Sequence, residues 1–283
     1  TPVRAMRETF SDIAPHLKAG AVVTDTGSTK RMVLTWAEEF LPDTVSFVGG
    51  HPMAGKSQSI EGAEADLFKG ATWCVTPSVK AEETAVRNVL GMITALGAEA
   101  YFLDPDEHDA YVAGISHLPF VLSASLMNTL GKDPSWRDMK TLTAGGFRDM
   151  TRLASGSPEM HRDIALTNRE ALTRWIDGTI ETLQWFRQTL AEPEERAAEE
   201  LTEFFNKARD TRAEWATQTT REGELLHGTQ SELAREGFGD QMGRMLFGGL
   251  LRRRINPAER LGRTAPGGRG TETRNGKTPK RPD

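Results

Sequence analysis

Short apolar runs alternate with amphipathic patterns through the first hundred residues. The runs at 21–24 and 45–48 have the length and the β-branched content of buried strands. Strands that alternate with helices indicate βαβ units, so this half predicts a parallel sheet covered by helices. The predicted strands are residues 21–24, 45–48, 72–76 and 99–103, and the predicted helices are 1–17, 29–40 and 82–96, with a helical patch at 63–68.

After Pro105 the strand pattern ends and helical periodicity continues. The chain therefore predicts an α/β half followed by an all-helical half, with the joint at 104–106. A glycine-containing loop is expected at 140–149. Disorder is expected beyond Pro257, where Gly, Pro, Thr and Arg dominate. The predicted helices of this half are 108–130, 157–190, one that opens at Pro193, and 240–255.

Composition says more about the cellular environment of the protein than about its chemistry. The chain has 283 residues, a formal net charge of −5 and a single cysteine, Cys74, which excludes an internal disulfide framework. Cys74 lies within a predicted strand and is interpreted as a core residue. No run approaches the ~20 apolar residues of a membrane span. We expect a cytoplasmic protein without membrane or nucleic-acid partners, whose basic C-terminal tail is solvated.

Polar side chains follow the first two predicted strands. In an open α/β sheet, ligands bind beyond the carboxyl ends of the strands, so Ser28 and His51 are expected to face one crevice. His51 is a candidate general base because imidazole titrates near neutrality; the alternative is a histidine that caps a loop. Ser28 can hydrogen-bond a substrate hydroxyl, cap the following helix, or do both. Asp25 and Lys30 are expected to structure the turn.

The helical half contributes further candidates. His117 follows His108 by nine residues, which at 100° per residue is half a turn out of phase. The two cannot share one face of a regular helix, so one of them is expected to lie away from the site. Arg152 offers a planar guanidinium that binds a carboxylate through two hydrogen bonds. The alternative is a surface arginine, and Arg148 is its nearest rival.

Four motifs together resemble the prephenate/arogenate dehydrogenase family of tyrosine biosynthesis. They are DTGSTK at 25–30, GGHPMAGK at 49–56, HDAYVAGISHLP at 108–119 and GGFRDMTRLASGSP at 145–158. Their order and spacing are specific, and the resemblance covers residues 1–218. It implies part of a Rossmann-type parallel sheet domain followed by an all-helical dimerisation domain.

The resemblance implies an oxidative decarboxylation of a cyclohexadienol with NAD or NADP as the hydride acceptor. Such a reaction needs a base for the hydroxyl proton and a cation for the dicarboxylate. His51 is then the base, assisted by Ser28, while Arg152 binds the ring carboxylate and His117 belongs to the substrate pocket. The remaining contacts that the resemblance implies are Lys56, Ser57 and Gly146 to the substrate, and Pro2, Thr26, Gly27 and Ser28 to the cofactor, with no metal.

Two positions depart from the family pattern. Many relatives carry glutamate where this chain has Ser57, and some carry an aromatic residue where it has His161. Loss of a carboxylate removes a partner for an ammonium group, which favours the keto acid prephenate over the amino acid arogenate. His108 and Asp109, at the start of their helix, are left with a capping role.

The resemblance also implies domain boundaries and a beginning within a fold. Residues 1–105 correspond to the last part of a dinucleotide-binding domain, 106–218 to a helical substrate and dimerisation domain, and 219–283 to an extension. The family's G-x-G-x-x-G turn is not found in these residues. About two βα units, roughly 60–70 residues, are expected ahead of Thr1. A homodimer through the helical domain is expected.

Three interpretations stay open on the sequence. The first is a prephenate dehydrogenase, with arogenate dehydrogenase as its variant. The second is another NAD(P)-dependent dehydrogenase, such as a β-hydroxyacid type, but that class uses a helical lysine where this chain has His117 and no lysine before Lys132. The third is a non-catalytic fragment, favoured by the lack of the glycine-rich turn.

Overall fold

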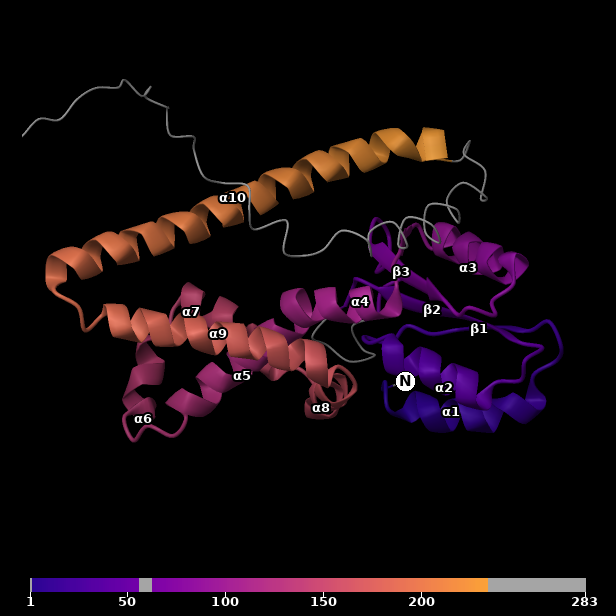
Figure 1. Ribbon diagram of the computed structural model, residues 1–283, viewed down its shortest axis with the longest axis horizontal. Coiled ribbons are helices and arrows are strands. Elements are labelled where there is room, and N and C mark those ends of the chain that lie inside the picture. The colour runs from indigo at the N-terminus through magenta and orange to yellow at the C-terminus, as the bar shows by residue number, and fades with distance from the viewer. Residues whose placement is uncertain (1, 56–62, 234–283) are drawn as a thin grey trace, which may run out of the picture. The chain divides into compact units, whose positions relative to one another are not determined.

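The α/β half is a four-stranded sheet with helices on both faces. The computed structural model describes residues 2–55 and 63–233, and side chains to residue 217 (Figure 1). The strands lie in the order β1-β2-β3-β4. They are β1 (Val22–Thr24), β2 (Ser46–Pro52), β3 (Thr72–Pro77) and β4 (Glu99–Phe102), and the helices of this half are α1 (Ala5–Ile13), a 3₁₀ turn (Ala14–His16), α2 (Arg31–Phe40) and α3 (Glu83–Ala95).

The sheet is mixed. β1 pairs with β2 in parallel and β3 with β4 in parallel, but β2 and β3 run antiparallel, with His51 opposite Cys74. The expectation of a parallel arrangement is therefore wrong for this one pair. A parallel connection needs a crossover element, and the predicted helical patch at 63–68 forms only turns. The antiparallel pairing continues just beyond β2, where Met53 N donates to Thr72 O at 2.7 Å.

Apolar side chains anchor α1 and α2 to one face of the sheet, and α3 covers the other (Figure 1). Phe10 of α1 meets Phe47 of β2 edge to face, with ring centroids 5.4 Å apart. Val33 and Trp36 of α2 join the same buried cluster. Because side chains alternate along a strand, His51 lies on the same face of β2 as Phe47.

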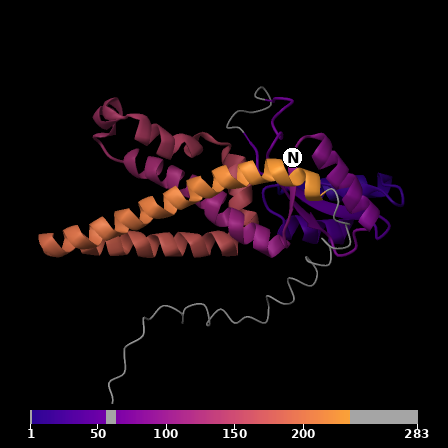
Figure 2. The same cartoon turned by 90° about the horizontal axis from the view of Figure 1, so that it is seen from above.

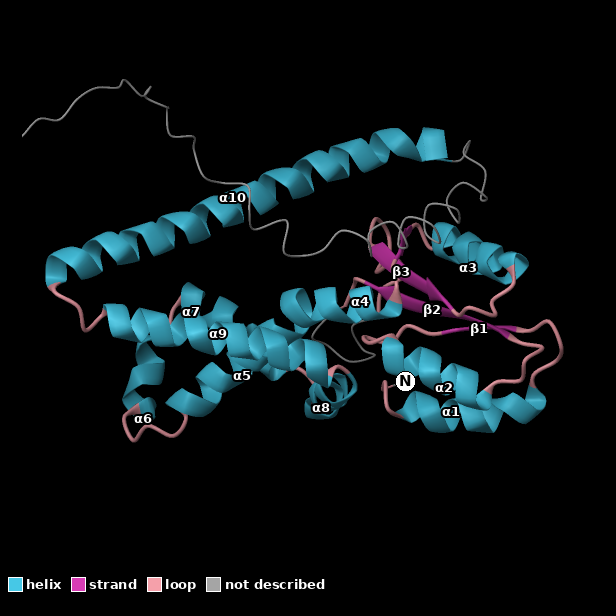
Figure 3. Cartoon of the chain, in the orientation of Figure 1, coloured by secondary structure: helices cyan, strands magenta, loops and turns pink. Residues whose placement is uncertain are grey.

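The second half is helical throughout its described residues (Figure 3). Helices α5 to α9 all lie on one side of the sheet (Figures 1 and 2). The elements are α4 (Pro105–Val112), a π segment (Ala113–His117), α5 (Leu118–Leu130), α6 (Trp136–Met139), a 3₁₀ turn (Lys140–Leu142), α7 (Gly145–Thr151), a 3₁₀ turn (Arg152–Ser155), α8 (Pro158–Thr167), α9 (Arg169–Thr189) and α10 (Glu194–Leu233). The architecture of an α/β half followed by helices is confirmed.

Two local expectations in this half are wrong. The predicted loop at 140–149 contains the start of α7, whose first two residues are glycines at an exposed helix end. The predicted helix over 157–190 is two helices, because Asn168 leaves the helical conformation with φ −128° and ψ 43°. Residues after Asn206 form a separate compact unit that begins within α10. The predicted helix at 240–255 and the tail beyond 257 lie outside the described residues.

The stretch from α4 to α5 contains the π segment. A π turn takes up more residues than an α turn and leaves backbone carbonyls without helical partners. Side-chain donors from later parts of the chain reach two carbonyls just before this segment: Trp175 Nε1 donates to Ala110 O at 3.2 Å, and Asn168 Nδ2 donates at 2.7 Å to Asp109 O, which also accepts from Ala113 N. The irregular turn is therefore stabilised by α9 and by the α8–α9 break.

Residues 105–130 are long and apolar enough to cross a membrane by length and composition, with a mean hydropathy of 1.4. The core helix of a folded domain can pass the same test. The side chains of His108, Asp109 and His117 within this stretch are buried against other parts of the protein. These contacts match the helix of a domain core.

Candidate functional site

A buried ion pair joins the ends of β1 and β2. The Asp25 carboxylate accepts hydrogen bonds from Gly27 N at 2.7 Å and Gly50 N at 3.0 Å, and it pairs with Lys30 Nζ. Lys30 Nζ also donates to Gly50 O at 2.6 Å. Burial lowers the pKa of Lys30, and the carboxylate of Asp25 opposes that shift. The expectation that Asp25 and Lys30 structure the turn is confirmed.

The close packing of β2 against its two neighbouring strands requires glycine at the two positions before His51. A Cβ on Gly50 would lie 2.6 Å from Asp25 O, and one on Gly49 would lie 2.4 Å from Thr76 Oγ1. Neither distance is possible for a side chain. Gly50 therefore allows the close approach of β2 to Asp25 at the end of β1, and Gly49 allows its close approach to Thr76 of β3.

Ser28 does not cap α2. That helix begins at Arg31, and the N–H groups of Lys30 and Arg31 donate to the Asp109 carboxylate at 2.7 Å and 3.1 Å. Asp109 belongs to α4, so the helical half caps a helix of the α/β half. The half-buried Ser28 hydroxyl has no hydrogen-bond partner among the described residues, which leaves it available to a ligand.

His51 and His108 are in direct contact. Nδ1 of His51 lies 2.9 Å from Nε2 of His108, and the ring centroids are 5.1 Å apart. His117 lies close enough to lower the pKa of His51. The expectation that one of His108 and His117 lies away from the site is wrong, because the π segment between them changes the helical phase. Asp109 does cap a helix, but in the other half of the chain.

The surroundings of His51 and His117 disfavour the imidazolium form. Burial is the largest cause, and it lowers the pKa of His51 to about 2, with further lowering by His108, Lys30 and His117. Burial lowers the pKa of His117 to about 4, although the charge of Asp109 acts in the opposite direction. Both rings are therefore neutral at pH 7, as a proton acceptor must be.

His117 presents one engaged and one free nitrogen. Its side chain is 1% exposed, Nδ1 lies 3.2 Å from Asn168 Nδ2, and Nε2 is buried without a partner in the described part of the chain. Beside it, Phe120 stacks on His161 with centroids 4.3 Å apart and planes at 6°. These rings form an aromatic wall next to the free nitrogen.

The remaining predicted substrate residues are not gathered around the histidines. Arg152 is exposed at the 3₁₀ turn after α7, and it makes no ion pair with residues 2–55 or 63–217. Gly146 is exposed within α7, and Asp149 makes no hydrogen bond to Arg152. The turn that carries Arg152 is attached to α5 by Ala154 N, which donates to Ser123 Oγ at 2.9 Å. Lys56 and Ser57 lie outside the described residues.

The predicted cofactor residues lie at the carboxyl end of β1. Thr26 is exposed, and Gly27 is buried, since a Cβ there would lie 2.8 Å from Asp25 Oδ2 and 2.9 Å from Met6. The contact with Met6 brings the start of α1, and with it the exposed Pro2, to the same edge of the sheet. No glycine-rich turn for the pyrophosphate occurs in this sequence.

Sequence reasoning missed three residues of this site. His108 and Asp109 are adjacent in the motif at 108–119, and this position could have indicated a role in the site. The phase of a regular helix, however, placed His108 on the face opposite His117. Asn168 gave no signal, because its contacts come from the break between two helices. Within the described ranges, no group of three His, Cys, Asp or Glu side chains is placed to hold a metal ion.

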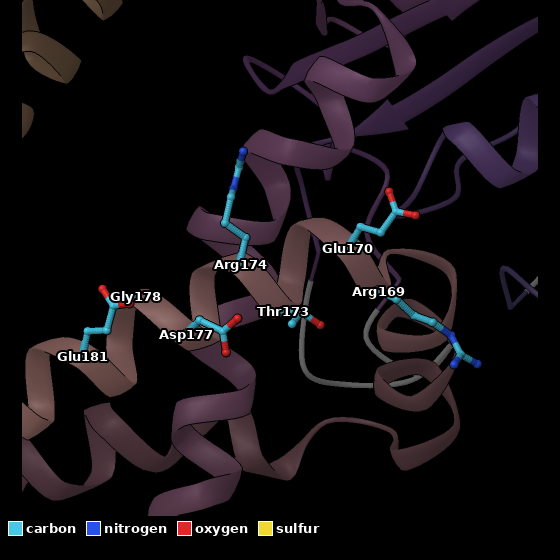
Figure 4. A pocket seen from close by; sticks show the side chains of 7 residues that line it. All are labelled: Arg169, Glu170, Thr173, Arg174, Asp177, Gly178 and Glu181. Carbon is cyan, nitrogen blue, oxygen red and sulfur yellow. The ribbon is translucent and has the colours of Figure 1, made fainter. Parts of the chain in front are cut away.

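A surface hollow lies apart from the histidines, along α9 (Figure 4). Its side chains carry both signs of charge, and one of them, Glu170, pairs with Arg31 at 3.2 Å. The lining residues are Arg169, Glu170, Thr173, Arg174, Asp177, Gly178 and Glu181. None of them is a predicted site residue.

Comparison with known proteins gives a consistent result. Residues 1–102 match the model of the prephenate dehydrogenase nucleotide-binding domain, and residues 104–207 match that of the prephenate dehydrogenase dimerization domain. A prephenate dehydrogenase of Bacillus subtilis is 38% identical over 215 residues, which are 75% of this chain. The chain spans 57% of the length of that relative.

Solved structures agree with these matches. The prephenate dehydrogenase of Aquifex aeolicus, in complex with hydroxyphenyl propionate and NAD+, is 31% identical with a TM-score of 0.69, covering 76% of this chain and 74% of that one. The arogenate dehydrogenase of Synechocystis is 28% identical with a TM-score of 0.64, covering 76% of this chain and 77% of its own.

Proposed function

Because this chain belongs to the prephenate dehydrogenase family, we propose that it supplies the catalytic histidine of an enzyme that oxidises and decarboxylates prephenate to 4-hydroxyphenylpyruvate. One observation carries the proposal. His51 is neutral, held at Nδ1 by His108, and free of partners at Nε2 among the described residues, and its strand β2 pairs in parallel with β1, whose carboxyl end leads to the unpartnered hydroxyl of Ser28. A base and a hydrogen-bonding hydroxyl at one strand edge are what the oxidation of an alcohol requires.

The proposed chemistry centres on the hydroxyl-bearing ring carbon of the substrate. Nε2 of His51 accepts the hydroxyl proton as the carbon–oxygen bond shortens, and Ser28 holds that oxygen by a hydrogen bond. An oxidised nicotinamide, when bound, supplies the acceptor for the hydride. The bond to the ring carboxylate breaks, CO₂ leaves, and its electron pair completes the aromatic ring. His51 then returns the proton to the phenolate oxygen, so the base is regenerated.

Substrate recognition is assigned to the helical half. Arg152 lacks an ion-pair partner in the described part of the chain, so its guanidinium is available for the ring carboxylate. His117 offers its free nitrogen to another oxygen of the substrate, and Lys56, Ser57 and Gly146 complete the set that the family resemblance implies. Ser57, in place of a glutamate, favours prephenate, and arogenate is the alternative substrate.

Cofactor binding is assigned to the edge of β1. Pro2, Thr26, Gly27 and Ser28 lie there, and the dinucleotide is NAD or NADP.

We also propose a cytoplasmic homodimer joined through the helical half. The matched domain is a dimerization domain. The described part of α9 and α10 exposes apolar side chains that one chain does not cover: Ile180, Leu183, Leu190 and Phe205.

A turnover assay tests the function directly. A full-length protein that contains this sequence is offered prephenate or arogenate with NAD+ or NADP+, and reduced cofactor is followed by absorbance. Turnover with prephenate is expected. Replacement of the base by His51→Gln is expected to lower kcat by about 10²- to 10⁴-fold with substrate binding nearly intact. His16→Gln, at an exposed position, is the matched control. No turnover in all four combinations by a folded protein contradicts the proposal.

A further inference from the structure

The two neutral histidines of the site are held from behind by different partners. Nδ1 of His51 faces Nε2 of His108 at 2.9 Å, and Nδ1 of His117 faces Asn168 Nδ2 at 3.2 Å. In a neutral imidazole one nitrogen donates and the other accepts, so the partner at one nitrogen decides what the other can do. The tautomers can therefore be derived from groups whose roles are unambiguous.

The first derivation starts at Asp109. Its Oδ1 accepts from Lys30 N at 2.7 Å and its Oδ2 accepts from Arg31 N at 3.1 Å, and Oδ1 also lies 2.8 Å from Nδ1 of His108. A carboxylate has no proton to give, so Nδ1 of His108 donates, and with that single ring proton Nε2 accepts. Nδ1 of His51 must then carry its proton, which leaves a lone pair on Nε2 of His51.

The second derivation starts at the carbonyl of Asp109. Asn168 Nδ2 donates to Asp109 O at 2.7 Å, and this contact fixes which way the amide points. The same Nδ2 therefore donates its second hydrogen to Nδ1 of His117. The proton of His117 then sits on Nε2, the nitrogen that is buried without a partner in the described residues.

We infer that Asp109, acting through His108, and Asn168 are positioning residues that hold the two imidazoles in opposite tautomers. His51 presents a bare nitrogen and His117 presents an N–H. One ring can only accept the hydroxyl proton, and the other can only donate a hydrogen bond to a substrate oxygen. The catalytic meaning of this arrangement rests on the proposed function, but the tautomers are a property of the protein without substrate.

The low pKa values of both rings support the inference, because an imidazolium would donate from both nitrogens. The geometry also explains two irregular features of the fold. Asn168 reaches Asp109 O because it breaks the helix between α8 and α9. Asp109 is held in place because its carboxylate caps α2 across the joint between the two halves. The tautomer of His51 therefore depends on the docking of those halves.

Nitrogen-15 NMR of histidine-labelled full-length protein without ligands tests the tautomers, with each signal assigned by a single-histidine replacement. The expected result is a protonated Nδ1 in His51 and His108 and a protonated Nε2 in His117. A protonated Nε2 in His51, or a doubly protonated His108, overturns the inference. The measurement needs no turnover, so it stands even when the proposed function fails.

Kinetics then test the positioning role. Asp109→Asn keeps the shape of the side chain but replaces one accepting carboxylate oxygen by an NH₂ group, which only donates. It is expected to lower kcat about ten- to a hundredfold, as the loss of a supporting partner does, with little change in KM. Asp106→Asn, an exposed carboxylate on the same helix, is the control with unchanged kcat. Unchanged kcat in a folded Asp109→Asn protein overturns the role of Asp109. Asn168→Ala is expected to raise KM instead, since it frees His117.

Discussion

Two regions of the molecule have opposite compositions. The joint is the contact between the α/β half and the helical half around Lys30 and Asp109, and the outer face is the set of exposed apolar side chains on α9 and the start of α10. At the joint, charged and polar side chains are buried: Lys30 is 0% exposed, and Asp25 and Asp109 are each below 10%. On the outer face, apolar side chains are exposed, with Leu183 at 61% and Phe205 at 56%. Burying polar groups and exposing apolar ones both cost free energy, so each region must be compensated.

The compensation differs between the regions. At the joint nearly every buried polar atom of the described residues has a partner within the same chain, and Nε2 of His117 is an exception. On the outer face the described chain supplies no cover. The polar groups at the joint are therefore satisfied within one chain, while the apolar side chains of the outer face stay exposed.

The largest expected effect comes from breaking the buried ion pair. Lys30→Met leaves the Asp25 carboxylate buried without its cation, which typically costs about 3–5 kcal/mol of unfolding free energy. Urea denaturation measures the loss. Lys80→Met removes a lysine from an exposed pair with Asp43 and is expected to leave stability nearly unchanged. Equal stability of both variants would show that Lys30 is not needed to hold the two strands.

The next effect concerns Arg152, a predicted site residue that lies outside the joint. Arg152→Ala removes charged hydrogen bonds to the ring carboxylate, worth about 1.5–3 kcal/mol, so KM for prephenate is expected to rise about ten- to a hundredfold. Folding stability should not change, because Arg152 makes no ion pair with the described residues. Arg148→Ala is the matched control on the same segment. A rise in KM for Arg148→Ala alone would move the carboxylate contact to the rival arginine.

The site and the sheet also show which features can be predicted from the sequence and which cannot. The two strands that lead to Ser28 and carry His51 were predicted as neighbours, and β1 pairs with β2, because strand length, β-branched content and topology are local or rule-bound. His108 was excluded because helical phase assumes a regular helix, and the π segment is supported by Asn168 and Trp175, which lie 59 and 65 residues after the carbonyls they bind. The direction of β3 was missed for a related reason: the choice between a crossover and a direct return lies in a segment with little periodicity of its own.

A smaller effect follows from titration at the joint. His117 has a pKa of about 4 in the folded protein and about 6.5 when unfolded. Below pH 6.5 the unfolded state binds the extra proton, so stability is full above that pH and falls as the pH drops toward 4. Between pH 7.5 and pH 5 the loss contributed by His117 is about 2 kcal/mol. His51, whose pKa is lowered to about 2, contributes a loss of similar size over the same range. Urea titrations at both values check the sum, and His117→Gln should remove about half of it. An equal loss in that variant would assign the acid sensitivity to other groups.

The smallest effect is expected on the outer face, and it separates the two regions most cleanly. Phe205→Ser removes an aromatic ring that is 56% exposed in one chain, so a partner copy can bury about half of it, worth roughly 1 kcal/mol per copy. In a symmetric dimer the residue occurs twice, so dissociation should become about thirtyfold easier by analytical ultracentrifugation. The unfolding of the monomer and the histidine tautomers should not change, because Phe205 is largely exposed and its aromatic contacts are to Phe186 and Phe204 of the same half. Val79→Ser, 97% exposed in the α/β half, is the matched control with an unchanged dimer. Equal dissociation of both variants would mean that the exposed apolar face of α9 and α10 is not the surface on which two copies meet.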